Sequence, residues 1–355
     1  MADLRFGYVG CGFMAQGVHI PNFAAIGGVE LTALAEIRPK LGEKVQKRWG
    51  FRKLYRSHLD LAKDPEVEAV GVSAGFSEQA QIARDLVRAG KHVFMEKPMA
   101  VSVAQGEELL EASRKGGGRL MVAYMKRYDP GNEIAKRYVD EFWRDEGMGG
   151  LFYARNHGFC GNWTAGMDAV FERTDEPRPE GPPEQYPDWL PEAMQGAYVG
   201  YLQQYTHNVN LLRWFTDAGD RAKVTAVDLN EDGLTGLVTF DMNGVRSVIE
   251  SGAISHHAWD EHTQLYFRNG WVKVSSPALL QKNASAAVEI YRAGKAQEVC
   301  RLIPVPYGWS YRREAEHFAG CVKSGERFRS SGEDTLADVR LFEEVYRRLV
   351  GRNAG

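Results

Sequence analysis

The chain has 355 residues, more than the roughly 250 to 300 at which a single hydrophobic core stops growing, so we expect two domains. Its 44 lysines and arginines against 47 aspartates and glutamates give a net charge of −3, and no basic block contains interleaved aromatic residues. This composition argues against nucleic acid as the main partner and favours a small, neutral or anionic substrate.

The amino terminus predicts a cytoplasmic protein without membrane contact. Met1 leads directly into a strand-like run without the parts of a secretory signal, and no apolar run approaches the roughly 18 residues of a membrane span. Cys11, Cys160, Cys300 and Cys321 lie far apart and form no C-x-x-C pair. We therefore expect reduced, mostly buried thiols and neither disulfides nor a zinc knuckle.

A glycine-rich turn follows the first apolar run, residues 4–9. Residues 10–15 read G-C-G-F-M-A and lead into a helical pattern. In such a turn Gly10 allows the sharp bend, Gly12 lets the backbone approach a pyrophosphate, and Ala15 permits close packing of helix on strand. The predicted cofactor contacts of this turn are Gly10, Gly12, Phe13 and Met14.

The second apolar run, residues 29–35, delivers Glu36 at its end. A carboxylate at this position accepts hydrogen bonds from the ribose hydroxyls of the adenosine and repels a 2′-phosphate. Arg38 is the competing signal, because its guanidinium could hold that phosphate with two hydrogen bonds. We expect NAD as the cofactor, with NADP as the open alternative.

Helical and strand-like patterns then alternate up to about residue 125. Four helices are expected: one over 39–49, one that begins at residue 58, one that is capped by Ser77 and ends at about residue 89, and one over 102–115. Strands are expected over 53–55, 69–73, 92–95 and 120–124. Helical crossovers between successive strands predict a doubly wound parallel sheet, the Rossmann architecture, in residues 1–125.

Lys97 follows one of these strands in the sequence KHVFMEKPMA. The carboxyl ends of the strands in an open parallel sheet converge on one crevice, so the Lys97 ammonium is expected there, where it can donate or accept a proton. Glu96 is expected to orient Lys97.

Residues 126–355 show a different pattern. Strand-like runs cover 151–157, 224–229, 234–240, 245–251, 263–267 and 271–274. Short turns containing asparagine and glycine separate most of them, which indicates hairpins and a mostly antiparallel sheet. Residues 200–216, 311–324 and 333–348 are expected to be helices.

The glycine turn, Glu36, the AGKHVFMEKPMA passage and the later HNVNLLRWF resemble the family of glucose-fructose oxidoreductase, inositol dehydrogenase and rhizopine catabolism proteins, abbreviated Gfo/Idh/MocA. The resemblance covers nearly the whole chain. It implies a Rossmann domain followed by an α+β domain with an open sheet, which serves substrate binding and the contacts of a homodimer or homotetramer.

The resemblance also assigns site residues, with departures. In the turn after strand 69–73, Gln79 stands where the family usually has a histidine, so a cofactor contact there must be made by an amide. Arg127 matches a family arginine near the nicotinamide, and Lys126 beside it adds a second positive charge that favours an anionic substrate. The remaining cofactor contacts that we expect are Ser73, Ala74, Glu96 and Lys97.

His207 is the second catalytic candidate. It lies in an apolar helical run, where a histidine is by default a core residue, but its place matches the family histidine. The family usually has aspartates four residues before it and three after it, whereas this chain has Gln203 and Asn210. The expected substrate contacts are Tyr128, Trp163, Gln203 and Asn210.

Residues 164–192 contain six prolines and eight carboxylates against two arginines, so they form neither a continuous helix nor an inner strand. Such a long loop is either functional or disordered. Phe171, Tyr186, Trp189 and Leu190 give it apolar anchors, which favour a substrate lid or an oligomer arm.

His256, His257 and His262 stand close to Asp260 and Glu261. His256, Asp260 and His262 could share one face of a strand, but the spacing lacks the fixed geometry of a metal site, so we predict no metal.

Together these patterns predict an NAD(P)-dependent oxidoreductase that moves a hydride between nicotinamide and a secondary alcohol or ketone of a sugar, cyclitol or related polyol. Lys97 or His207 would exchange the hydroxyl proton. Two alternatives stay open: an enzyme that cleaves glycosides with tightly held NAD, and a non-catalytic NAD(P)-binding regulator.

Overall fold

The computed structural model describes residues 2–254, 259–293 and 299–353. The chain forms two compact units. The first comprises Met1–Tyr124, Asp168–Pro187 and Tyr311–Val339, and the second comprises Met125–Met167, Asp188–Ser310 and Arg340–Gly355. The two-domain division at residue 125 stays a prediction, and it does not include the two later segments that join the first unit.

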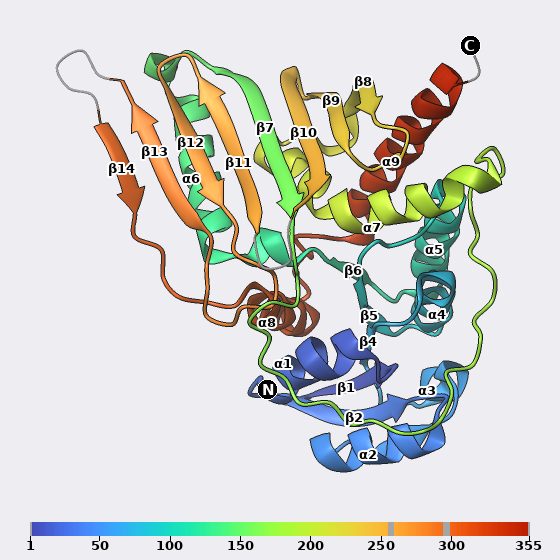
Figure 1. Cartoon of the computed structure of the whole chain (residues 1–355). Coiled ribbons are helices and arrows are strands. Elements are labelled where there is room, and N and C mark those ends of the chain that lie inside the picture. Colours follow the sequence, from blue (N-terminus) through green and yellow to red (C-terminus); the bar gives the residue numbers. More distant parts are fainter. Residues whose placement is uncertain (1, 255–258, 294–298, 354–355) are drawn as a thin grey trace. The chain divides into compact units, whose positions relative to one another are not determined.

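The first unit is built on a parallel sheet (Figure 1). Its strands are β1 Leu4–Val9, β2 Val29–Ala35, β3 Lys53–Tyr55, β4 Ala69–Val72, β5 His92–Glu96 and β6 Leu120–Ala123. They lie in the order β3-β2-β1-β4-β5-β6, and all neighbours are parallel. The order reverses between β1 and β4, where ligands bind in doubly wound sheets. The predicted fold class is confirmed.

The helices of this unit come from the connections between its strands and from the last part of the chain. They are η1 Ala15–His19, α1 Ile20–Ala24, α2 Pro39–Trp49, α3 His58–Lys63, α4 Phe76–Arg88, α5 Val103–Gly116, α8 Ser310–Ser324 and the first part of α9 Gly332–Asn353. Helix α2 starts with proline, whose fixed φ suits the first helical position, and ends at Gly50 with φ 77°. Helix α5 starts at Ser102, whose hydroxyl accepts from the Gln105 amide at 3.4 Å.

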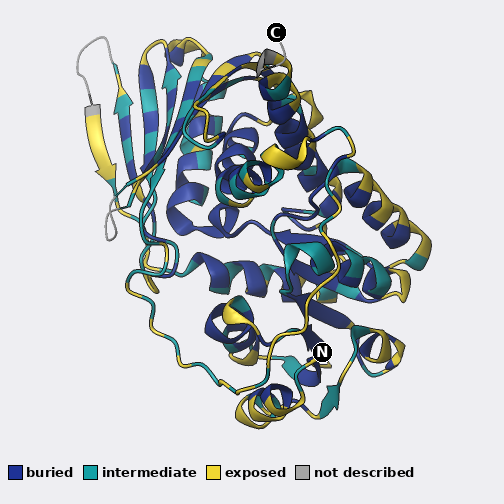
Figure 2. Cartoon of the chain, turned by 45° about the vertical axis from the view of Figure 1, so that its right-hand side comes forward, coloured by how far each residue is buried: buried dark blue, intermediate teal, exposed yellow. Residues whose placement is uncertain are grey.

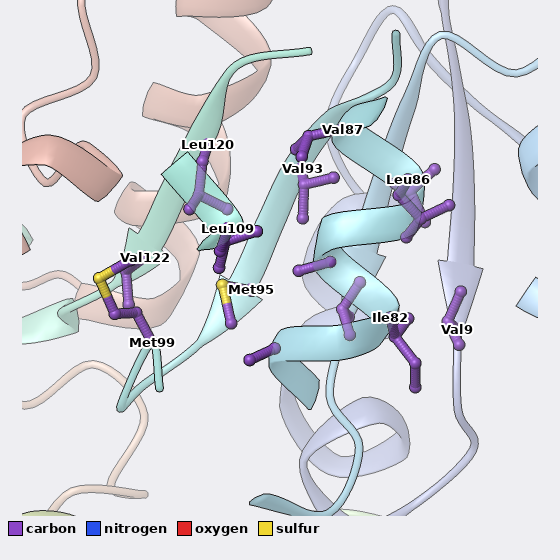
Figure 3. Packing of buried hydrophobic residues seen from close by; sticks show 14 of the residues in the cluster. Val9, Ile82, Leu86, Val87, Val93, Met95, Met99, Leu109, Leu120 and Val122 are labelled. Carbon is purple, nitrogen blue, oxygen red and sulfur yellow. The ribbon is translucent and has the colours of Figure 1, made fainter. Parts of the chain in front are cut away.

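Both faces of this sheet are covered by apolar side chains. On one face Ile82, Leu86 and Leu109 of α4 and α5 pack against Val93 and Met95 of β5 (Figure 3). Fully burying each such side chain is worth roughly 1.5–3 kcal/mol relative to leaving it exposed.

The other face carries a cluster of phenylalanines. Phe6 of β1 stacks on Phe23 of α1 with 4.0 Å between ring centroids, and Phe94 of β5 lies 5.6 Å from Phe318 of α8. Helix α8 thus completes this face, although it comes from the last part of the chain.

The second unit is built on an open sheet of eight strands. These are β7 Leu151–Cys160, β8 Lys223–Leu229, β9 Gly236–Met242, β10 Val245–Ala253, β11 Asp260–Phe267, β12 Gly270–Ser275, β13 Ala287–Arg292 and β14 Val299–Ile303. Their order is β14-β13-β12-β11-β7-β10-β9-β8, in which only β7 and β10 pair in parallel. The predicted mostly antiparallel sheet is confirmed, but β13 and β14 were not predicted.

The helices of the second unit pack on one face of this sheet. They are η2 Met125–Tyr128, α6 Pro130–Arg144, η3 Glu146–Met148, α7 Glu192–Phe215, η4 Gly219–Arg221 and the end of α9. Helix α7 starts eight residues before the predicted start at residue 200. Along β11 and β12 buried residues alternate with intermediate ones, because successive side chains point to opposite faces (Figure 2).

All four cysteines carry free thiols, as predicted, although Cys300 is exposed. Among the residues that the structure describes, no helix combines the length and the apolar character needed to cross a bilayer.

Candidate functional site

The glycine turn after β1 has the geometry of a dinucleotide site. Gly10 has φ 92°, and a Cβ there would lie 2.7 Å from the carbonyl oxygen of Ser73, so this position requires glycine. Gly12 is exposed, and a Cβ there would meet no described atom within 4 Å. The turn therefore fits the close approach of a pyrophosphate to the backbone.

Glu36 at the end of β2 is buried and joins the turn. One of its carboxylate oxygens accepts from the Cys11 amide at 2.7 Å, and the other accepts from the Arg38 amide at 3.0 Å. Burial, followed by the nearby Glu36 carboxylate, raises the pKa of the Cys11 thiol well above its usual range. Glu36 thus lies directly beside the glycine turn, as an adenosine-ribose contact requires.

Arg38 is held by Glu36. Its Nε donates to Glu36 Oε1 at 2.7 Å and its Nη2 donates to Glu36 Oε2 at 3.3 Å. The hydrogen bond with Glu36 raises the pKa of Arg38. Glu36 and Arg38, the two residues that favour different cofactors in the sequence, therefore form an ion pair with each other.

Lys97 lies half-buried just beyond the end of β5. Burial lowers the pKa of its ammonium below the ordinary value of about 10.5, and the negative charge of Glu96 opposes this shift. The Glu96 carboxylate accepts from the Lys97 backbone amide at 3.0 Å and contacts His19 Nε2 at 2.7 Å. Glu96 therefore fixes the backbone at Lys97, and His19 is a partner that sequence reasoning missed.

Two further side chains surround this strand end. Gln79 is buried, and its amide nitrogen donates to the carbonyl oxygens of Glu96 at 2.6 Å and Pro98 at 3.2 Å. Glu314 of α8 is fully buried, and burial followed by the charge of Glu96 raises its pKa well above its usual range. Gln79 thus supports the Lys97 turn through its amide nitrogen, while its predicted cofactor contact stays a prediction.

Ser73 and Ala74 lie half-buried after β4, beside the glycine turn. The Ser73 hydroxyl accepts from the Tyr8 hydroxyl at 3.0 Å. Phe13 is 39% exposed, and Met14 is half-buried at the start of the helix. The first unit therefore gathers the predicted cofactor residues, apart from Arg127, along one edge of its sheet.

In the second unit Arg127 and Asn210 are brought together. Arg127 is buried in η2, its Nε donates to Asn210 Oδ1 at 2.6 Å, and its Nη2 donates to the Asn210 carbonyl at 3.3 Å. Asn210 of α7 therefore takes a charge-assisted bond at the place where the family has a carboxylate. Their predicted roles toward nicotinamide and substrate stay predictions.

The other predicted residues of the second unit differ in exposure. Trp163 is 40% exposed and Gln203 is exposed, whereas Tyr128 is only 1% exposed. His207 is buried on α7 with 5% exposed. Gln203 and His207 are four residues apart and so share one side of the helix.

Lys126 is also buried in the second unit, and its ammonium forms an ion pair with the buried Glu261 of β11. The Asn208 amide donates to Glu261 Oε1 at 3.2 Å and to Asn156 Oδ1 at 2.6 Å. The expected second positive charge is therefore neutralised within the unit, which removes the argument that Lys126 favours an anionic substrate. Sequence reasoning missed this pair because its members lie 135 residues apart.

A small pocket lies in the second unit beside η2. Lys126, Asp129, Asn132 and Trp309 are among its lining residues, but Tyr128, Trp163, Gln203 and Asn210 are not. Asp129 is held by the amides of Gly131 at 2.7 Å and Ala286 at 3.1 Å. The pocket therefore does not gather the predicted substrate residues.

The predicted histidine cluster lies only partly in the described residues, because His256 and His257 fall outside them. His262 Nδ1 lies 3.4 Å from Asp260, and His157 also contacts Asp260 at 3.4 Å. Among residues 2–254, 259–293 and 299–353, no group of three metal-ligating side chains converges on a common point.

Most of the long proline-rich loop packs against the first unit. We call residues Asp168–Pro187 the strap (Figure 1). Phe171 of the strap stacks on Phe13 with 5.2 Å between ring centroids. The Gln16 side chain donates to the Glu172 carbonyl at 3.2 Å and accepts from the Glu172 amide at 2.7 Å.

The strap continues along the same edge of the sheet. Its Glu176 carboxylate binds the start of α2, and Arg178 pairs with Glu78 of α4 at 3.5 Å. At its far end Gln185 accepts from Gln105 of α5 at 3.3 Å. The strap therefore contacts the first turn of each helix that follows β1, β2, β4 and β5.

Two of the aromatic anchors that favoured a substrate lid or an oligomer arm are covered within the chain itself. Phe13 supplies an apolar surface to Phe171, and the Arg347 guanidinium covers Trp189 at 4.2 Å in the second unit. A contact of the loop with substrate or with a second subunit stays a prediction.

Part of the chain is similar in sequence to known oxidoreductases. Residues 4–124 match the GFO_IDH_MocA model, described as an oxidoreductase family with an NAD-binding Rossmann fold. An inositol 2-dehydrogenase of Salmonella typhimurium is 32% identical over 140 residues, 39% of this chain and 41% of that protein. The chain thus matches about two fifths of the length of this relative.

Two other proteins are similar over nearly the whole chain. A myo-inositol 2-dehydrogenase of Thermotoga maritima is 22% identical over 93% of this chain and 92% of that protein. The solved structure of a levoglucosan dehydrogenase with NADH and L-sorbose superposes with a TM-score of 0.75 at 18% identity, covering 99% of this chain and 98% of that one. At this identity the likeness shows the fold.

The matched region contains the glycine turn, the acidic residue after β2 and the E-K-P turn after β5. The expected nicotinamide dinucleotide agrees with the description of the family. Over residues 4–124 the chain therefore matches the NAD-binding Rossmann domain of the Gfo/Idh/MocA oxidoreductase family.

Proposed function

We propose that this chain is an NAD(P)-dependent oxidoreductase that transfers a hydride between nicotinamide and a secondary alcohol or ketone of a sugar, cyclitol or related polyol. The observation that carries the proposal is Lys97, a half-buried lysine with a lowered pKa at the carboxyl end of β5. It shares this edge of the sheet with the glycine turn and Glu36. The dehydrogenase relatives support the substrate class.

In the proposed reaction a bound nicotinamide supplies or accepts the hydride. Lys97 Nζ takes the hydroxyl proton during oxidation and returns it to the carbonyl oxygen during reduction. A lowered pKa suits this role, because a general base works best when its pKa is near the operating pH. Glu96 and Gln79 hold the backbone from which Lys97 extends.

His207 is the second candidate for the proton. It is buried, and Gln203 and Asn210 replace the carboxylates that would orient it and raise its basicity. We therefore assign the proton to Lys97 and a hydrogen bond with the reacting oxygen to His207. Arg127 is assigned to the nicotinamide end.

The test is a screen of sugars, cyclitols and their keto forms with both NAD and NADP, followed by the nicotinamide absorbance. We expect turnover with at least one polyol and a preference for NAD. Cofactor binding without turnover of any polyol would favour the non-catalytic regulator and contradict the proposal.

A second candidate is a glycoside-cleaving enzyme that holds NAD tightly. The strap favours it, because it contacts the starts of four helices along the edge where a dinucleotide binds. NAD that stays with the protein through extensive dialysis, together with glycoside cleavage and no net absorbance change, would support this candidate over net redox turnover.

A homodimer or homotetramer, cytoplasmic in location, remains the expectation. Light scattering at several protein concentrations measures the mass of the assembly.

A further inference from the structure

The start of helix α2 already holds a carboxylate. Glu176 Oε1 accepts from the Lys40 amide at 3.0 Å, and Glu176 Oε2 accepts from the Leu41 amide at 2.9 Å. The residue before them in the helix is Pro39, which has no amide hydrogen. Glu176 therefore takes the first two amide donors that α2 offers to an anion.

The Glu176 side chain is well fixed. The Thr174 hydroxyl donates to Glu176 Oε2 at 3.1 Å, and Glu176 is half-buried. The strap residues just before it are also held to α2, by Arg48 with Glu172 at 3.2 Å and by Lys40 Nζ with Asp175 at 3.2 Å. Although burial acts to raise it, the pKa of Glu176 is lowered overall by the bonds from the two α2 amides, so the carboxylate is charged at neutral pH.

This carboxylate lies in the region that distinguishes the two dinucleotides. In Rossmann folds the residue at the end of the second strand contacts the 2′-hydroxyl, and a nearby arginine accommodates a 2′-phosphate. Here that residue is Glu36, which already binds Arg38 through two nitrogens. Glu176 binds the backbone amides two and three residues after Arg38, and its negative charge also acts to raise the pKa of that guanidinium.

We propose that Glu176, delivered by the strap, is a specificity-determining residue that selects NAD against NADP by filling the start of α2 and adding a second carboxylate beside Arg38. The inference rests on the proposed dinucleotide function. A 2′-phosphate would meet two carboxylates and would lack both the α2 amides and a free face of the guanidinium. Glu36 alone therefore accounts for only part of the discrimination.

The experiment uses two probes that differ only in the 2′-phosphate, adenosine 5′-monophosphate and adenosine 2′,5′-bisphosphate. Their dissociation constants are measured by calorimetric titration of the full chain and of its variants. For the wild type we expect weaker binding of the bisphosphate. Glu176→Ala should improve binding of the bisphosphate relative to the monophosphate by about tenfold or more, the range of one or two charge-assisted hydrogen bonds.

Asp175→Asn is the matched control. It removes the same charge from the neighbouring strap residue, whose side chain is 85% exposed and pairs with the Lys40 ammonium. We expect the ratio of the two dissociation constants to change little in this variant. Glu176→Gln keeps the size of the side chain and should give an intermediate ratio, while Glu36→Ser with Glu176→Ala should give the largest change.

A ratio that changes only in the Glu176 variants supports the inference. If Glu176→Ala and Asp175→Asn change the ratio equally, or if the wild type prefers the bisphosphate, the inference is overturned while the dinucleotide function stands. If neither probe binds the wild type, the proposed function fails as well.

Discussion

Two lysines, Lys97 of the first unit and Lys126 of the second, show how differently a fold can treat the same side chain. Lys126 is buried directly against the carboxylate of Glu261, so its charge is balanced within the unit. Lys97 is half-buried, and the neighbouring Glu96 carboxylate contacts His19 and the Lys97 backbone amide. Burial therefore dominates at Lys97 and lowers its pKa.

The difference separates a structural lysine from a titrating one. A close carboxylate stabilises the ammonium form and holds it charged, whereas burial stabilises the neutral amine. A lysine whose pKa is lowered releases its proton more readily, as a group that must both accept and donate a proton requires. On this ground we assign catalysis to Lys97 and stability to Lys126, and four predictions test the comparison.

The largest effect is expected on stability. Glu261→Ala leaves the Lys126 ammonium buried without its carboxylate, which should lower the free energy of unfolding by about 3–5 kcal/mol. Denaturant unfolding measures the change. The control is Asp60→Ala, which breaks the exposed pair with Lys63 and should cost less than about 1 kcal/mol. Equal losses in the two variants would contradict a structural role for Lys126.

Lys97→Ala should lower kcat by roughly 100-fold or more and leave NAD affinity near that of the wild type, since it removes only the group that exchanges the proton. Lys97→Arg keeps the positive charge but cannot lose a proton, so it should not restore the rate. His207→Ala should cost less and act mainly on KM. Steady-state kinetics that show the reverse order would move the proton to His207.

The pH profile should follow the neutral form of Lys97. Oxidation needs the free amine, so kcat for oxidation should rise with pH through an inflection below 10.5 and then level off. Glu96→Gln removes the charge that stabilises the ammonium, so the inflection should move to lower pH. Glu108→Gln, which alters an exposed carboxylate paired with Arg84, should leave it unchanged. A shift to higher pH in Glu96→Gln would refute this account.

The smallest effect is expected from Gln203→Asp. It restores the family carboxylate four residues before His207, which should raise the basicity of the imidazole and move the pH profile by a few tenths of a unit to about one unit. Gln204→Asp places the same charge on the neighbouring position and should have no such effect. The pH dependence of kcat/KM distinguishes the two variants.

The sequence predicted the parts of the fold that are encoded within short stretches. Strands β1 and β2 and helix α2 were predicted with their observed bounds, because apolar runs and Pro39 mark their ends locally. Strands β13 and β14 were not predicted. Residues of β13 alternate in burial, but the partners that make it a strand are β12 and β14, and pairing across a sheet leaves little mark on a single segment.

The same distinction holds for the candidate site. Gly10, Gly12, Glu36 and Lys97 follow strand ends, so their common edge could be predicted from topology alone. The contact of Glu176 with Lys40 joins residues 136 positions apart, and nothing in a proline-rich acidic loop specifies which helix it will meet. The pairing of Glu96 with His19 was missed for the same reason.

The late arrival of α8 has a consequence for synthesis. Phe318 belongs to the aromatic cluster with Phe6, Phe23 and Phe94, yet about 200 residues separate it from the end of β6. At about 5–20 residues per second, a ribosome needs roughly 10 to 40 seconds to make that interval. During this time the nascent sheet exposes one apolar face, which is the kind of surface that chaperones bind and that makes a truncated amino-terminal fragment prone to aggregate.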